Sequence, residues 1–429
     1  MKIPERFATT FTHPVHAPAP GLPVVSTPVT PVRQPLAWHF GNRLLNRTVV
    51  DYAFRCLGAE HVAAGTLDRF ASVGLPYVAG MAVLTRIRGW DAWHREWEVH
   101  AAQCLEQRAI LDPTHDGSNG SNGSNGDGDG GGDSSVNAWR DCTREAAIAL
   151  HVAQLFVTDV VGKRALHERA AALYREVAPL LDPPAETVAL RFRGVSVPGY
   201  LSMPPEASMQ HPAPLAVFLN GGSTSKEELT GWREPFLARG FAVLALDNPG
   251  TGESWGGTSY TPNQHALLDD LRHLVAERAA LDGRIALIGV SLGGMLAVDL
   301  ATEAPDLAAV ITITSPFAPG EYITEMAPLT QWEVAHVTGF PPDCLPYLCH
   351  AASLAPRAPR LFMPTLIVGA GKDWIVPPRE AKRLYAACVA PRTLHWYPQA
   401  SHCCFSHLPM MLTDTARWLA RAVPVGGGK

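Results

Sequence analysis

Charged side chains are scarce in this chain of 429 residues, and basic ones are not in excess. They make up 17% of the sequence, against about 25% in a typical soluble domain. The formal net charge is −5, which excludes a broad basic surface for nucleic acid. Since 47% of the residues are apolar, the sequence predicts extensive buried surface or a large apolar cavity.

The sequence also lacks long hydrophobic runs and paired cysteines. No run reaches the roughly 18 apolar residues that a membrane-spanning helix needs, and no continuous apolar segment typical of a secretory signal follows the N-terminus. The eight cysteines form no CxxC pair, so we expect reduced thiols in a cytoplasmic protein. The adjacent His402, Cys403 and Cys404 cannot supply the tetrahedral spread of ligands that zinc needs, and we expect neither a metal nor a cofactor.

Composition separates an N-terminal leader from a helical domain. Residues 1–37 are rich in Pro, Thr and Val without periodicity, which is typical of an extended or disordered leader. Residues 38–181 are rich in Ala, Leu, Glu and Arg and predict a helical N-terminal domain. Within it, residues 116–135 contain no apolar side chain and predict a flexible loop. A Ca²⁺-binding repeat is the alternative for this loop, but neither the EF-hand spacing nor the nonapeptide repeat is present.

After residue 182 the pattern changes to short β-branched or aliphatic runs that alternate with helical stretches. The runs lie at residues 187–192, 196–203, 215–219, 242–246, 285–289, 309–314, 365–368 and 393–397. For residues 182–424 this alternation predicts an α/β fold, with a mostly parallel sheet, helices on both faces and an antiparallel hairpin at its start. Because ligands of such sheets bind beyond the carboxyl ends of the strands, we expect the functional residues there.

Residues 289–293, Gly-Val-Ser-Leu-Gly, connect a strand run to a helical run. In this context the GxSxG pattern predicts a nucleophile elbow, a sharp turn that exposes its serine. Ser291 would lie at a helix N-terminus, where backbone N–H groups and the helix dipole favour a developing oxyanion. The alternative is a glycine-rich turn in which the serine has no chemical role.

A serine nucleophile needs a base and a group that orients the base, and in this kind of fold they follow in the order Ser, Asp, His. Asp373 and His402 each follow a strand run of their own, so both would lie at the carboxyl ends of strands. This placement predicts Ser291 as nucleophile, His402 as base and Asp373 as the orienting acid. His395 and His407 are the alternative bases, but His395 lies inside a strand run and His407 in the helix expected next.

The loop after the run 215–219 is expected to supply a second oxyanion donor. It reads Asn-Gly-Gly-Ser, and its glycines would let a backbone N–H face the substrate. We expect the N–H groups of Gly222 and Leu292 to hold the oxyanion, with Ser223 as the alternative to Gly222 and as a substrate contact. Residues 247–254 lack the lysine and the glycine spacing of phosphate loops, and they predict a structural turn that lines the site.

The connection after the sixth predicted strand is long. Residues 315–363 exceed by far the roughly two to six residues usual for such connections, and they predict a lid over the catalytic face. Its aromatic residues, among them Tyr322 and Trp332, suit an apolar or polycyclic ligand, and Glu321 and Glu325 could assist proton transfer in C–C cleavage. The alternatives are that the aromatic residues pack the lid against the helical domain and that the glutamates are merely solvated.

Together these motifs resemble the α/β-hydrolase superfamily, in particular its branch with FrsA-type esterases and hydrolases encoded beside polyketide synthases. The residues that carry the resemblance are 40–42, 57–58, Trp90, Trp93, Trp97, 182–184, 198–201, 221–222, 226–228, 247, 249–254 and 289–294. The resemblance implies the roles given above for Ser291, Asp373 and His402. It also implies that the helical domain covers the active site.

The leading hypothesis is a serine hydrolase that acts through an acyl-serine on an ester, thioester or β-diketone-like C–C bond. The resemblance implies an apolar, polyketide-derived small molecule as substrate. One alternative is a tailoring enzyme of secondary-metabolite biosynthesis that uses the same triad for dehydration, cyclisation or acyl transfer. A remote alternative is a non-catalytic binding protein. The helical domain could also bury a homodimer interface.

Overall fold

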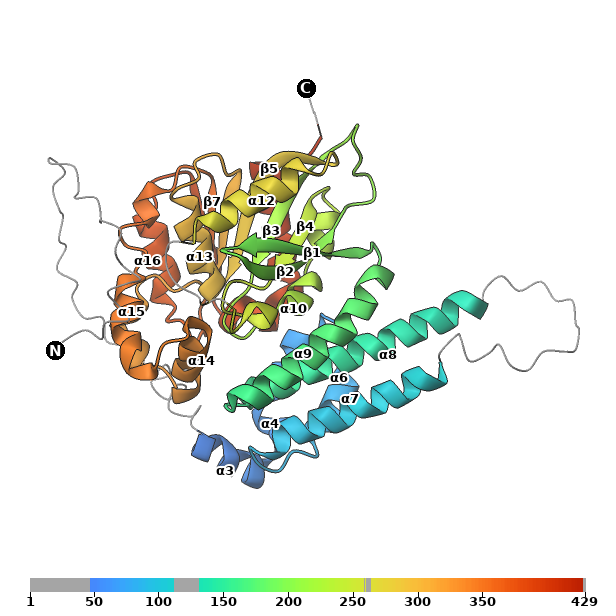
Figure 1. Cartoon of the computed structure of the whole chain (residues 1–429). Coiled ribbons are helices and arrows are strands. Elements are labelled where there is room, and N and C mark those ends of the chain that lie inside the picture. Colours follow the sequence, from blue (N-terminus) through green and yellow to red (C-terminus); the bar gives the residue numbers. More distant parts are fainter. Residues whose placement is uncertain (1–46, 112–130, 258, 260–263, 427–429) are drawn as a thin grey trace, which may run out of the picture. The chain divides into compact units, whose positions relative to one another are not determined.

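A computed structural model describes residues 47–111, 131–257, 259 and 264–426 of the chain (Figure 1). The chain divides into two units, Met1–Pro35 and Leu36–Lys429, and every described residue belongs to the second unit. The predicted leader, residues 1–37, and residues 116–130 of the predicted loop lie outside the described residues. Among the helices that the structure describes, none combines the length and the hydropathy that a membrane crossing requires.

An eight-stranded sheet in the order β1-β2-β4-β3-β5-β6-β7-β8 forms the centre of the described unit (Figure 1). The strands are β1 (Ala185–Phe192), β2 (Val195–Ser202), β3 (Ala213–Leu219), β4 (Ala242–Leu246), β5 (Leu281–Val290), β6 (Ala309–Ile313), β7 (Thr365–Ala370) and β8 (Arg392–Tyr397). β2 pairs antiparallel with both β1 and β4, and all other neighbours are parallel. The predicted α/β class and its antiparallel hairpin are therefore confirmed.

The burial of each strand follows from its sequence. β3, β4, β6 and β7 are buried at every position, and each is a continuous run of mostly aliphatic and small residues. Such runs are expected of parallel strands that are covered on both faces. β1, at the edge of the sheet, instead alternates over much of its length between buried and exposed positions.

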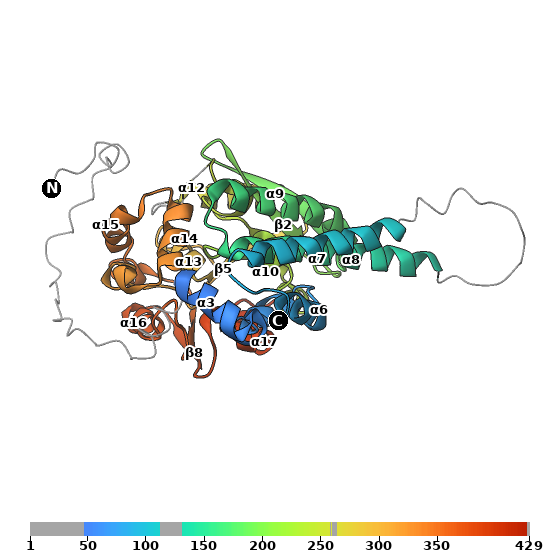
Figure 2. The ribbon, with the colours of Figure 1, turned by 90° about the horizontal axis from the view of Figure 1, so that it is seen from below.

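A helical segment precedes the sheet. Its helices are α3 (Arg47–Leu57), α4 (Ala59–Val62), α5 (Gly65–Ala71), α6 (Tyr77–Leu84), α7 (Ala92–Ile110), α8 (Gly131–Ala153) and α9 (Val160–Val177). α7 and α8 lie side by side in both views (Figure 2). The sequence did not predict α6, because its eight residues are nearly all apolar and show no helical period.

One boundary of the predicted flexible loop is corrected by α8. This helix begins at Gly131, so residues 131–135, predicted as the end of the loop, are helical. The physical reason is cooperativity: once a helix is held by its packed part, each further residue adds one backbone hydrogen bond without a new nucleation step. A polar sequence can therefore continue the helix that the apolar sequence starts.

Helices cover both faces of the sheet, and two more lie in the connection between β6 and β7. Those that cover the sheet are α10 (Lys226–Thr230), α11 (Glu234–Leu237), α12 (Ala266–Ala276), α13 (Leu292–Ala301), α16 (Arg379–Ala387) and α17 (Leu408–Ala422), and those in the connection are α14 (Pro328–Thr338) and α15 (Leu345–Ala351). Because side chains alternate along a strand, Leu215 and Val217 of β3 face one side and Ala216 and Phe218 the other. The first side packs with α12, α13 and α16, and the second with α11 and α17.

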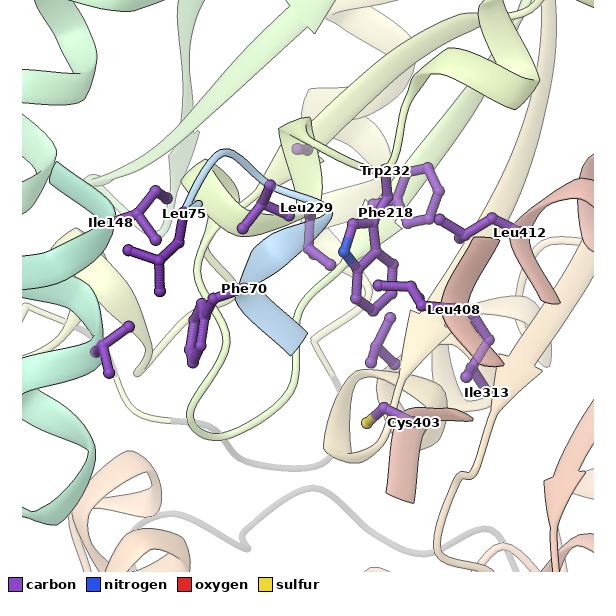
Figure 3. Close-up of a cluster of buried hydrophobic side chains, with 14 of the residues drawn as sticks. Phe70, Leu75, Ile148, Phe218, Leu229, Trp232, Ile313, Cys403, Leu408 and Leu412 are labelled. Carbon is purple, nitrogen blue, oxygen red and sulfur yellow. The ribbon is translucent and has the colours of Figure 1, made fainter. Parts of the chain in front are cut away.

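The helical segment shares one hydrophobic core with the second face of the sheet. Figure 3 shows this cluster, whose labelled members include Phe70, Leu75, Ile148, Phe218, Leu229, Trp232, Leu408 and Leu412. Leu75 and Ile148 belong to the helical segment, whereas Phe218 lies on β3 and Leu408 on α17. Burial of side chains from both parts in one cluster holds the helical segment against the sheet.

The predicted lid lies between β6 and β7 and contains α14 and α15. Part of it packs on itself: Tyr322, Ile323 and Met326 are buried in one small cluster with Leu345 and Cys349. The lid therefore has a hydrophobic core of its own in addition to its contacts with the catalytic part.

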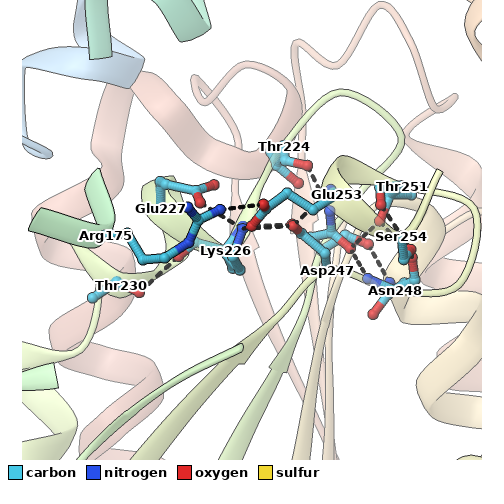
Figure 4. A network of polar contacts seen from close by, with 11 residues as sticks. Arg175, Thr224, Lys226, Glu227, Thr230, Asp247, Asn248, Thr251, Glu253 and Ser254 are labelled. Carbon is cyan, nitrogen blue, oxygen red and sulfur yellow. Dashed lines mark hydrogen bonds and ion pairs between the residues drawn. The ribbon is translucent and has the colours of Figure 1, made fainter. Parts of the chain in front are cut away.

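A buried ion cluster joins the loops that follow β3 and β4 (Figure 4). Lys226 Nζ lies 2.6 Å from Glu227 Oε1, 2.9 Å from Asp247 Oδ2 and 2.6 Å from Glu253 Oε2. Arg175 of α9 pairs with the other carboxylate oxygen of Glu253 at 2.5 Å. Burial lowers the pKa of Lys226, but the three carboxylates outweigh burial and raise it well above its ordinary value. One ammonium thus compensates several buried negative charges.

We expect Lys226→Met to lower the free energy of unfolding by about 3–5 kcal/mol, because the carboxylates of Glu227 and Asp247 would stay buried without their cation. The shift of the urea-unfolding midpoint measures this loss. Lys382→Met, at an exposed position over Trp396, is the matched control and should change stability by less than about 1 kcal/mol. Equal midpoints for the two variants would contradict the role assigned to the Lys226 ammonium.

Candidate active site

Ser291 occupies the sharp turn between β5 and α13. Its backbone angles, φ 52° and ψ −117°, are ones that a residue with a side chain adopts only where its surroundings enforce them. A Cβ at Gly289 would overlap the Gly293 carbonyl oxygen, and a Cβ at Gly293 would overlap the Leu219 carbonyl oxygen. Glycine is therefore required at Gly289 for β5 to pack against the start of α13, and at Gly293 for α13 to pack against the end of β3.

Ser291, His402 and Asp373 form one hydrogen-bonded chain. His402 Nε2 lies 3.0 Å from Ser291 Oγ, and His402 Nδ1 lies 2.8 Å from Asp373 Oδ2. The other oxygen of Asp373 accepts hydrogen bonds from the N–H groups of Ile375 at 2.9 Å and Val376 at 2.8 Å, which fix the carboxylate. Ser291 follows β5, Asp373 follows β7 and His402 follows β8. The structure thus brings together the three residues that the sequence singles out.

The loop that carries His402 is also strained. Cys403 and Cys404, which follow it, both have a φ of 55°, in the left-handed region that residues with side chains rarely adopt. The Cys403 N–H donates a hydrogen bond to Thr314 Oγ1 at 3.1 Å, and Thr314 directly follows β6. This contact ties the His402 loop to the neighbouring strand and helps to enforce its conformation.

Burial and the Asp373 carboxylate act on the pKa of His402 in opposite directions. Burial lowers it, because the imidazolium loses water, whereas the carboxylate favours the imidazolium. The charge outweighs burial and raises the pKa of His402 above its ordinary value. The site therefore stabilises a proton on His402, as it must once the proton of Ser291 has been transferred.

The loop after β3 lies directly against Ser291. A Cβ on Gly221 would lie 3.3 Å from Ser291 Cβ. The Gly221 N–H donates to Thr224 Oγ1 at 2.6 Å and is thereby engaged within the loop. Asn220 Oδ1 accepts from the Asn248 N–H at 2.8 Å, which anchors the loop to the end of β4. The loop is thus held in place by the residues that follow two adjacent strands.

A cavity of about 380 Å³, the Ser291 cavity, opens beside the serine. Its lining residues are Gly65, Thr66, Arg69, Leu155, Phe156, Gly221, Gly222, Ser223, Thr224, Ser291, Leu292, Pro316, Met326, Leu329, Thr330, Glu333, Val334, Ile375, Val376, Ser401, His402, Cys403 and Phe405. Gly222 and Leu292, the predicted oxyanion donors, and the alternative Ser223 are among them. Their backbones therefore border the space that a substrate of Ser291 would fill.

Arg69 of α5 links the helical segment to the loop after β3. Its guanidinium makes two hydrogen bonds with the buried Glu228 carboxylate, at 2.8 and 2.7 Å, and one with the Ser223 carbonyl oxygen at 2.8 Å. His151 Nε2 of α8 lies 3.3 Å from the same carboxylate. Sequence reasoning missed Arg69, because partners 154 and 159 residues away leave no local pattern.

Three predicted substrate contacts in the lid do not line the Ser291 cavity, which corrects the expectation from sequence. Glu321 pairs with Arg383 of α16 at 2.8 Å. Tyr322 is buried in the lid's own cluster, and Glu325 is exposed. The reason is that this part of the lid packs on itself and on α16, so its side chains are directed to those neighbours.

The fourth predicted lid contact, Trp332, is corrected in the same way. Its ring stacks on His336, with the ring centroids 5.0 Å apart. The residues of α14 that line the Ser291 cavity include Leu329 and Glu333 instead. They lie four residues apart, on one face of a helix. That spacing is the sequence signal by which Glu333 could have been found.

Possible metal ligands come within 4.8 Å of one another in two groups of described residues: His167, Glu227 and Asp247, and His100, Cys104 and Glu145. In the first group Lys226 already bonds both carboxylates, so an ammonium supplies the positive charge. In the second, His100 Nε2 lies 2.8 Å from Glu145 Oε1, so these two side chains are partners of each other.

Comparison with known proteins supports the fold and shows which hydrolases the chain is similar to. A family model described as "Serine aminopeptidase, S33" matches residues 210–343 and 344–408. The chain is 36% identical over 148 residues to 2,6-dihydropseudooxynicotine hydrolase of Paenarthrobacter nicotinovorans, a match that covers 34% of this chain and 39% of that protein. It is 29% identical over 188 residues to the alpha/beta hydrolase pydG of Acremonium sp, a match that covers 41% of this chain and 43% of that protein. The chain thus spans about two fifths of the length of these curated relatives.

The structural likeness extends over more of the chain. The crystal structure of 2,6-dihydroxy-pseudo-oxynicotine hydrolase matches with a TM-score of 0.71 and 22% identity, covering 85% of this chain and 97% of that chain. This likeness confirms the predicted α/β-hydrolase fold. The chain therefore has the α/β-hydrolase fold and is similar, over part of its length, to hydrolases of that superfamily.

We expect Asp373→Asn to lower the pKa of His402, because an amide cannot stabilise the imidazolium as the carboxylate does. Reaction of Ser291 with a fluorophosphonate needs neutral His402, so its rate rises with pH through that pKa. The inflection of the labelling rate should lie above pH 6.5 in the wild type and at lower pH in Asp373→Asn. The maximal labelling rate of Asp373→Asn should be lower than that of the wild type by about 10³-fold or more.

Intact-mass measurement of the labelling rate against pH checks this prediction. Asp306→Asn, at an exposed position paired with Arg272, is the matched control and should reproduce the wild-type profile. An inflection that stays in place in Asp373→Asn would show that Asp373 does not set the pKa of His402.

Proposed function

We propose that the chain is a serine hydrolase that cleaves an ester, thioester or β-diketone-like C–C bond of an apolar small molecule. The observation that carries the proposal is the hydrogen-bonded chain from Asp373 through His402 to Ser291 in the wall of a cavity. Relatives described as hydrolases support it.

The geometry supports a covalent mechanism in two halves. Ser291 Oγ attacks the carbonyl carbon while His402 Nε2, 3.0 Å away, takes the hydroxyl proton. The oxyanion is held by the N–H groups of Gly222 and Leu292. The tetrahedral intermediate then expels the leaving group, which takes the proton from His402. A water that gives its proton to His402 attacks the acyl-serine, releases the acid and restores the serine.

The lining of the Ser291 cavity favours an apolar acyl portion. Its side chains from the helical segment include Leu155 and Phe156, and those from the lid include Met326, Leu329 and Val334. Such a surface binds a ligand mainly by removing apolar area from water, at about 25 cal/mol per Å². A polyketide-derived substrate, which the sequence resemblance implies, agrees with this lining and stays a prediction.

Labelling with an alkyl fluorophosphonate, followed by intact-mass analysis and peptide mapping, tests the proposal. We expect one adduct on the wild type, located on Ser291, and none on Ser291→Ala. His402→Ala should label at least about 10³-fold more slowly, because the hydroxyl loses its base. Ser196→Ala and His211→Ala, at exposed positions, are the matched controls and should label like the wild type.

The absence of an adduct on the folded wild-type chain would contradict the proposal, and so would labelling of Ser291→Ala at an unchanged rate. An ester that acylates Ser291 but is released only to an added alcohol or amine, and not to water, would contradict hydrolysis and favour the acyl-transfer alternative.

A further inference from the structure

A second cavity, of about 120 Å³, lies beside the Ser291 cavity and is here named the polar chamber. Residues of α9, α14 and the loop after β4 form its walls, among them Lys163, His167, Glu253 and Glu333. The two cavities share Glu333 and the loop residues 222–224 as lining. These shared residues are the boundary between the two spaces.

The charges around the polar chamber are paired. Lys163 Nζ lies 3.3 Å from Glu333 Oε2, and Arg164 Nε lies 2.6 Å from Glu168 Oε1. Glu253 is bound by Lys226 and Arg175 (Figure 4). Pairing on this scale leaves little net charge to attract an anion or a cation.

Two histidines of the chamber, His167 and His336, add no charge near neutral pH. Burial lowers the pKa of His167 to about 3 and that of His336 to about 4. His336 is also stacked between the rings of Trp255 and Trp332, with centroids 4.5 and 5.0 Å away. The chamber is therefore a neutral, polar space with an aromatic stack at one wall.

Hydrogen-bond acceptors without a partner line this space. His151 Nδ1 and Glu333 Oε1 are buried and have no hydrogen-bond partner among the described residues. His151 is only 2% exposed, and its Nε2 bonds the Glu228 carboxylate, so in the neutral ring Nε2 carries the proton and Nδ1 is an acceptor. Buried acceptors left unpaired are costly, so a partner from outside the chain is expected. Both acceptors call for a ligand that donates hydrogen bonds.

We propose that the polar chamber binds a neutral hydroxyl- or amide-bearing part of the same substrate whose acyl carbonyl reaches Ser291. The substrate crosses the boundary formed by Glu333 and residues 222–224, which both cavities share as lining. The proposed function assigns the apolar acyl portion to the Ser291 cavity, and this inference rests on it. The substrate class is then an amphipathic acyl compound with a hydrogen-bond donor at its far end.

Two matched series of p-nitrophenyl esters test this assignment. In one series the acyl chain ends in a hydroxyl or a carboxamide, and in the other it ends in a methyl group at the same chain length. For the wild type we expect kcat/KM to favour the polar end by about tenfold or more at one chain length, the length that spans the boundary. No such preference is expected for shorter chains.

The decisive variant is the double substitution Lys163→Met and Glu333→Met, which removes both members of the chamber's ion pair together. Replacing both charges together avoids a single unpaired buried charge. It should reduce the polar-end preference to about one. His167→Phe, at a residue that lines the chamber and not the Ser291 cavity, is a second, independent variant: it should weaken the preference with fluorophosphonate labelling of Ser291 within about threefold of the wild type. Lys382→Met with Glu303→Met, at exposed positions, is the matched control.

A wild type without preference for the polar end at any chain length would overturn the assignment, since the chamber would then hold only water. A preference that persists unchanged in both chamber variants would overturn it as well. Failure of the proposed function has a different signature: no labelling of Ser291 and no turnover of either ester series.

Discussion

The close packing of the β5–α13 turn against the end of β3 is the constraint on which the site depends. Gly289 and Gly293 have no room for a side chain, so the turn can form only with glycine at these positions. That packing gives Ser291 its unusual backbone angles and presents its hydroxyl at the edge of the sheet. It also brings the loop with Gly221 against the serine. Ser291 and the loop after β3 are therefore positioned together.

The helical segment is part of this arrangement through both apolar and ionic contacts. A continuous core joins it to the sheet (Figure 3). The buried pair of Arg69 and Glu228 then ties α5 to the loop that carries Ser223. A buried ion pair adds little net stability but strongly specifies which groups must meet. We therefore regard Arg69 as a residue that positions the loop after β3 relative to the helical segment.

The sequence predicted those features that depend on local pattern and chain order. Most parallel strands are continuous aliphatic runs, and Ser291, Asp373 and His402 follow three parallel strands, β5, β7 and β8, so their convergence follows from the parallel sheet. The lid contacts could not be placed in this way, because the direction of a side chain such as Tyr322 depends on what packs against it. The role of Arg69 could not be predicted for a related reason, because its partners lie more than 150 residues away in the sequence.

The central claim is that Ser291 forms a covalent acyl intermediate, and acid quenching during turnover of a p-nitrophenyl ester tests it most directly. The account predicts that peptide mapping of the quenched protein finds the acyl group on Ser291, and that Ser291→Ala has neither the acyl group nor turnover above background. An acyl group on another residue, or full turnover by Ser291→Ala, would contradict the account.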